Sequence, residues 1–139
     1  MRTLYDTLNR ADVEGVHPKQ KDHAWRVLAE ACARMARADG LSCGQEPGAF
    51  ASAVLLEASR HHEPVYDRQS DAQFDEDPSW GSPAAPRISG VDGLITLAHH
   101  PDCATSDVLT AIEELSGDPV RAVRYQIALH LCNLHRTAP

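Results

Sequence analysis

Apolar residues recur at helical spacing along most of this 139-residue chain. The clearest run follows Asp118 and Pro119, residue types that suit the cap and the first position of a helix. One apolar stripe then predicts an amphipathic helix to about residue 135, formed by Val120, Val123, Ile127, Leu131 and Leu134. A second apolar row lies on another face of this helix, formed by Tyr125, Leu129 and Cys132. A helix with two apolar rows needs neighbours on two sides, so we expect it to belong to a stack of helices.

The same periodicity predicts further helices at residues 3–10, 19–38, 48–61, 87–99 and 106–115. The helix at 48–61 is apolar almost all round, so we expect it to be the most buried. Short connections between the last three helices predict antiparallel neighbours. The expected fold is all-α, an antiparallel, helical-repeat-like bundle of five or six helices. We expect one domain, 1–139, with N-terminal helices at 1–62 and C-terminal helices at 88–136.

Residues 63–87 differ from the predicted helical segments on either side, because they hold four prolines and show no helical periodicity. Six acids and one arginine fall within residues 63–78, so most of the net charge of −7 lies here. We predict a long, acidic, Pro-rich loop, either solvated or docked to a basic partner. Phe74 and Trp80 are unusual for a disordered linker and are expected to pin the loop against the helices.

The amino-acid composition further restricts the possible classes of function. The net charge of −7 argues against nonspecific binding to nucleic acid, which needs clustered Lys and Arg. The four cysteines are scattered without a CxxC pair, and Cys32 and Cys132 fall on apolar helix faces, so both are interpreted as reduced core residues. The chain shows no signal-peptide pattern and no apolar run of membrane-spanning length. These features predict a cytoplasmic protein.

Residues 108–134 resemble a HEAT-type helical repeat, in which two helices join through a tight turn. The resemblance is carried by Gly117-Asp118-Pro119, Val123-Arg124, Ile127-Ala128 and Leu131. Ile127 departs from the family pattern, which usually has a smaller residue there. The loop at 79–83 is more loosely similar to segments that precede helices in large bacterial multidomain ATPases. The resemblance implies an α-solenoid scaffold that presents a surface to partners, within a larger bacterial assembly.

The most ligand-like cluster is His99-His100-Pro101-Asp102-Cys103, which His61 and His62 could join in space. Zinc prefers four tetrahedral nitrogen or sulfur ligands. Adjacent histidines at a helix end usually point in different directions, and their partial charge suits the C-terminal dipole. We therefore favour a structural role for these residues and expect no metal and no cofactor, with zinc binding left as the alternative.

Recognisable catalytic motifs are absent from the sequence. Cys103, close to Asp102 and His100, is the nearest approach to a nucleophile, and an ordinary loop cysteine is the favoured interpretation. We expect no enzymatic activity. The alternative is a HEAT-like nucleic-acid-binding or base-excision enzyme, which could recruit Trp25 and Trp80 but would need a basic groove.

The function that we expect is a non-catalytic protein–protein interaction or scaffold module. Arg121 and Arg124 share a helix face and could bind an acidic partner or a phosphate. We favour simple solvation or pairing with acids of the preceding helix, such as Glu113 or Glu114. An uncovered row on the last helix predicts a homo-oligomer or a neighbouring part of a longer array. The residues expected to contact a protein partner are Tyr125, Leu129, Cys132, Arg121, Arg124, Phe74 and Trp80.

Overall fold

The computed structural model describes residues 1–10, 17–76 and 84–134, with side chains up to His130. The described residues form seven helices and no strands, which confirms the predicted all-α class. The helices are α1 (Arg2–Asn9), α2 (Pro18–Ala36), α3 (Glu46–Ser59), α4 (Arg68–Glu76), α5 (Pro86–Ala98), α6 (Ser106–Ser116) and α7 (Arg121–Leu134). None of the described helices is both long and apolar enough to cross a membrane.

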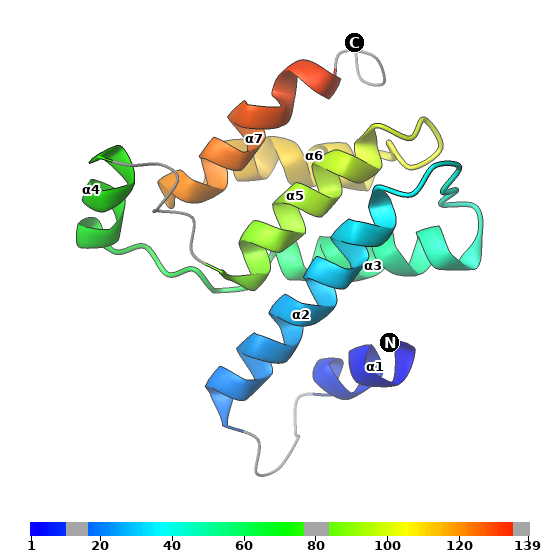
Figure 1. Ribbon diagram of the computed structural model, residues 1–139, viewed down its shortest axis with the longest axis horizontal. Helices are drawn as coiled ribbons and strands as arrows, with labels where there is room; N and C mark the ends of the chain where they lie inside the picture. The colour runs from blue at the N-terminus through cyan, green and yellow to red at the C-terminus, as the bar shows by residue number, and fades with distance from the viewer. Residues whose placement is uncertain (11–16, 77–83, 135–139) are drawn as a thin grey trace.

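The bundle has two layers (Figure 1). In this view α2, α5 and α7 run side by side in one layer, and α3 and α6 lie behind them. Helices α2 and α3 form one consecutive pair, α5 and α6 form the next, and α1 packs against α2. This alternation between layers gives each helix of the front layer contacts both beside and behind it.

Helix α5 is the centre of the bundle, because it contacts α2, α3, α6 and α7. Nine of its 13 residues are buried, against six of 14 in α3. The expectation that the helix at 48–61 would be the most buried is therefore wrong. Hydrophobicity alone did not distinguish the two helices; the number of neighbouring helices did. The largest fully buried side chains include four from α5: Val91, Leu94, Ile95 and Leu97.

Two glycines let α5 approach α3 closely. A β-carbon added at Gly90 would lie 2.6 Å from the backbone nitrogen of Ser59, and one added at Gly93 would lie 2.3 Å from a methyl carbon of Leu55. Both distances are shorter than van der Waals contact, so the crossing needs residues without side chains at these positions.

The expectation that residues 63–87 would be a loop without regular structure is wrong in part, since α4 forms within them. Phe74 of α4 is buried, and its ring packs edge-on against that of Tyr125 in α7, with centroids 5.3 Å apart. Only Asp71 and Phe74 of this nine-residue helix are buried. Such a short stripe leaves almost no periodic signal, so α4 depends on tertiary contact with α7. The predicted pinning is confirmed for Phe74, and Trp80 lies outside the described residues.

The last helix begins at Arg121, two residues after the predicted first helical position, Pro119. Asp118 is buried and accepts a hydrogen bond from the backbone N–H of Val120 at 2.8 Å, which closes a turn before the helix instead of capping its first turn. The predicted apolar stripe is confirmed where side chains are described: Val120, Val123 and Ile127 are buried. The side chains of Leu131 and Leu134 lie outside the described part.

We predict that Gly90→Ala will lower the free energy of unfolding by about 1–3 kcal/mol, because the added methyl group meets the rigid backbone of α3. Alanine normally stabilises a helix interior relative to glycine, so the expected sign is opposite to the intrinsic preference. Urea unfolding measures the change. Gly44→Ala is the matched control, since its β-carbon would meet only the Ser42 hydroxyl, at 3.5 Å. Equal stability of the Gly90 variant and the wild type would contradict the close crossing.

Candidate functional site

A cleft of about 850 Å³ opens between α1, α2 and the C-terminal end of α3. Its apolar wall comes from both helices of the α1–α2 pair. Tyr5 of α1 packs edge-on against Trp25 of α2, with ring centroids 6.0 Å apart, and this contact holds α1 at the cleft. The apolar residues lining the cleft are Leu4, Leu8, Ala24 and Trp25, and polar residues around them include Gln20, Lys21, Asp22, Glu57, Arg60, His61 and His62.

Three of these polar residues converge on one another. Nε2 of His61 lies 3.4 Å from Oδ1 of Asp22, and Nε2 of His62 lies 3.8 Å from the same oxygen. The two imidazole rings are stacked, with centroids 4.4 Å apart. We call these three residues the Asp–His–His cluster. The expectation that adjacent histidines point in different directions is wrong for this pair, because the chain turns beyond α3 and brings both rings to α2.

His61 is held on several sides. Its carbonyl oxygen accepts a hydrogen bond from Nη1 of Arg87 at 3.2 Å, and its Nδ1 accepts one from the backbone N–H of Glu63 at 3.1 Å. The ring also lies beside that of Trp25, with centroids 6.4 Å apart. These contacts come from three segments of the chain, so the position of the ring is determined by the fold.

Burial lowers the pKa of His61 below its usual value, and the positive charge of protonated His62 lowers it further, while Asp22 acts in the opposite direction. The neutral form is therefore favoured near neutral pH. Because Nδ1 accepts from Glu63, the neutral ring carries its proton on Nε2, facing Asp22.

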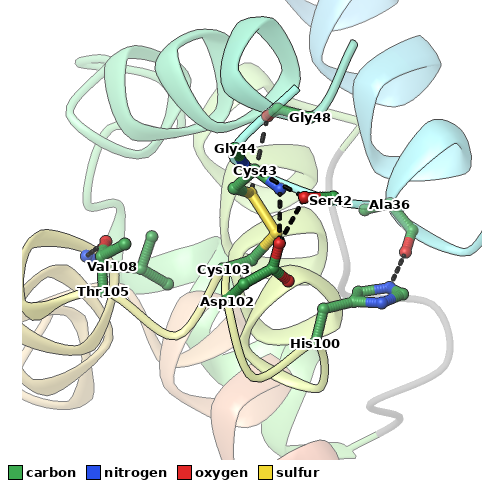
Figure 2. Close-up of a disulfide and its surroundings, with 10 residues drawn as sticks. All are labelled: Ala36, Ser42, Cys43, Gly44, Gly48, His100, Asp102, Cys103, Thr105 and Val108. Atoms are coloured by element: carbon green, nitrogen blue, oxygen red, sulfur yellow. Dashed lines mark hydrogen bonds between the residues drawn. A yellow bond between two sulfur atoms is a disulfide. The ribbon is translucent and has the colours of Figure 1, made fainter. Parts of the chain in front are cut away.

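The second histidine pair has a different role. Nε2 of His100 lies 2.8 Å from the carbonyl oxygen of Ala36 and joins the end of α5 to the end of α2 (Figure 2). Burial, followed by the nearby charges of His130 and His100, lowers the pKa of His99. Among the described residues, the Asp–His–His cluster is the only group of three potential metal ligands, so His99, His100 and Cys103 do not join it.

Cys103 forms a disulfide with Cys43, which sequence reasoning missed. A bonded sulfur provides no thiolate, so the interpretation of Cys103 as a nucleophile is wrong, and so is that of an ordinary loop cysteine. The two cysteines are 60 positions apart, which is no recognisable spacing, and only the fold brings them together. Structural disulfides are rare in a reducing cytosol, so this pair gives no support to the expected cytoplasmic location.

The disulfide lies in a hydrogen-bonded corner that joins two loops (Figure 2). The carboxylate of Asp102 accepts hydrogen bonds from the hydroxyl of Ser42 at 2.5 Å and from the backbone N–H of Cys43 at 3.2 Å. The Ser42 bond is the main cause of a pKa below the usual value for Asp102. Cys32 is a buried free cysteine, as predicted, and burial raises its pKa to about 11.

The predicted partner-binding residues fall mainly on α7 and α4. Tyr125 and Leu129 are 36% and 50% exposed, and Phe74 covers one edge of Tyr125. Arg121 pairs with Asp71 at 3.3 Å and with Asp75, both in α4, so the expected pairing with Glu113 or Glu114 is wrong. Arg124 donates to the carbonyl oxygen of Pro119 at 3.1 Å. Trp80 and the side chain of Cys132 lie outside the described part.

Comparisons with protein-family models, with curated proteins and with solved structures found no match for this chain.

We predict that the double variant Cys43→Ser/Cys103→Ser will lose about 2–4 kcal/mol of unfolding free energy, because the disulfide closes a long loop and restricts the unfolded chain. Thermal and urea unfolding measure this loss, and wild-type protein reduced before unfolding should match the variant. A peptide map under non-reducing conditions checks the pairing directly. Recovery of both cysteines as free thiols from oxidised protein would contradict it.

We also predict that Ser42→Ala will raise the pKa of Asp102 towards its usual range, since the lost hydroxyl stabilises only the ionised carboxylate. In the wild type, this hydrogen bond contributes stability above the unfolded pKa of about 3.9, and that stability is lost as the pH falls through the lower folded value. NMR titration of the Asp102 side chain measures the shift. An unchanged pKa would show that the Ser42 bond is not its main cause.

Proposed function

We propose that this chain is a non-catalytic protein-interaction module of the helical-repeat type, and that its α7 face pairs with a second copy of the chain. The observation that carries the proposal is a row of exposed, uncharged residues on α7, namely Tyr125, Ala128 and Leu129. We call this row the α7 strip. Its i, i+3, i+4 spacing places the three residues on one side of the helix, as in a helix–helix seam.

The position of α7 in the bundle supports this proposal. In the front layer α5 lies between α2 and α7, so α7 is at an edge of the layer, with α5 on one side and α6 behind it (Figure 1). The alternating layers also agree with the HEAT-type interpretation, in which each unit is covered by its neighbour. A second α7 packed against the strip would supply such a neighbour.

Charges beside the strip favour a second copy as the occupant. Arg121 and Asp75 flank the strip, their side chains are 43% and 57% exposed, and they already pair within one chain. In a two-fold interface, Arg121 of each copy can face Asp75 of the other, so one surface is complementary to itself. The alternative of a nucleic-acid-binding or base-excision enzyme remains a prediction that no observation on the described residues favours.

We predict a reversible dimer in sedimentation equilibrium experiments on the full chain. The exposed parts of Tyr125 and Leu129 supply less than the ~800 Å² per partner of a typical stable interface, so weak association is expected. Leu129→Glu should weaken the dimer about ten-fold or more, which corresponds to roughly 1.4 kcal/mol, because it places a charge in the seam.

Val27→Glu is the matched control, since Val27 is similarly exposed, at 41%, on α2. This variant should associate like the wild type. A wild-type chain that stays monomeric at millimolar concentration would rule out the second copy and leave a different protein as the occupant of the strip. Equal weakening by both substitutions would instead indicate nonspecific hydrophobic association.

A further inference from the structure

We propose that the Asp–His–His cluster binds a divalent transition-metal ion of the zinc class. This inference does not depend on the proposed function, because the cluster lies on α2 and the turn after α3 and the α7 strip plays no part in it. The sequence favoured a structural role for His61 and His62 and contained no signal for Asp22, which lies 39 and 40 positions before them.

The geometry of the three donor atoms carries the inference. Asp22, His61 and His62 each offer one potential ligand atom, and these three atoms lie within 4.8 Å of one another. Zinc bonds of about 2.0–2.2 Å at tetrahedral angles place ligand atoms roughly 3.4 Å apart. The Asp22–His61 distance of 3.4 Å already has that value, and the Asp22–His62 distance of 3.8 Å is close to it.

The side chain that must move to complete the site is that of His62, which is also the one that is free to move. The His62 side chain is 66% exposed, whereas those of His61 and Asp22 are 11% and 23% exposed. Rotation of the outer ring out of the stack can bring its nitrogen to the ion without disturbing the packed residues. Two ligands are thus held in place by the fold, and the third closes on the metal.

The types of donor select the class of ion. Two imidazoles and one carboxylate suit zinc and similar first-row ions, and three protein ligands leave a coordination position for water. The Asp22 carboxylate has both histidine rings within 4 Å, so a metal would replace them as its partner. The cluster lines the cleft, which gives an ion and its water a route from solvent.

Metal coordination would change which nitrogen of the His61 ring carries the proton, and this change can be observed. In the structure, Nδ1 of His61 accepts a hydrogen bond from the backbone N–H of Glu63. When Nε2 binds an ion, the ring proton must move to Nδ1, which can then no longer accept that hydrogen bond. That hydrogen bond must therefore break, and the Glu63 amide must turn to another acceptor or to water. The loss of this bond leads us to expect micromolar rather than nanomolar affinity.

Isothermal titration of chelator-stripped full-length chain with zinc chloride tests the proposal. We expect one ion per chain with a Kd of about 1–100 µM, where micromolar binding is a moderate affinity. Asp22→Asn and His62→Ala should each weaken binding about ten-fold or more, since even outer partners of metal ligands contribute 10–100-fold. In parallel, the Glu63 amide resonance should shift when zinc is added to the wild type and shift less at the same zinc concentration in Asp22→Asn.

His130→Ala is the matched control, because His130 forms a comparable pair with a carboxylate, lying 3.9 Å from Asp92, but belongs to no group of three potential ligands among the described residues. Its zinc affinity should equal that of the wild type. His62 is exposed, so His62→Ala keeps the test valid even if Asp22→Asn reduces stability, which circular dichroism would reveal. Absence of stoichiometric uptake, or wild-type affinity in His62→Ala, would overturn the proposal; the second result would indicate adventitious binding by surface histidines.

Discussion

The close crossing of α5 over α3 is the constraint on which the rest of the structure depends. Gly90 lies against the backbone of Ser59, where a β-carbon would be only 2.6 Å from the Ser59 nitrogen. Ser59 is the last residue of α3, so this contact determines where the following histidines emerge. Because α5 also contacts α2, α6 and α7, a shift at this crossing would be transmitted to most of the bundle.

Arg87, near the start of α5, extends this control to the Asp–His–His cluster and to α7. Its guanidinium donates to the carbonyl oxygens of His61 and Pro64, and its Nε lies 3.4 Å from Oδ2 of Asp118, an ion pair without a hydrogen bond. One partly buried cation therefore joins the turn after α3 to the turn before α7. Leaving Asp118 buried without this cation would be costly, so we regard the three segments as one structural unit.

The opposite end of α5 is held by covalent and polar contacts instead. The Cys43–Cys103 disulfide and the hydrogen bonds of Asp102 join the α2–α3 loop to the α5–α6 loop, and His100 joins the same region to α2 (Figure 2). With both ends of the central helix anchored, the less enclosed parts of the described bundle are α1, α4 and the outer face of α7. The two surfaces proposed to bind, the cluster in the cleft and the α7 strip, both lie next to these parts.

The all-α class and most of the helices follow from the pattern of apolar residues alone, because the apolar stripes are long enough to show a helical period. The same pattern indicated the buried stripe of α7 and the burial of Cys32. The other features depend on contacts between segments that are distant in the sequence. Helix α4 has too short a stripe to be recognised, the Cys43–Cys103 pair has no spacing signature, and Asp22 meets His61 and His62 only because α2 and α3 pack together. Periodicity reports which face of a helix is buried, whereas contacts between distant segments depend on which helices become neighbours, and that is a property of the whole packed core.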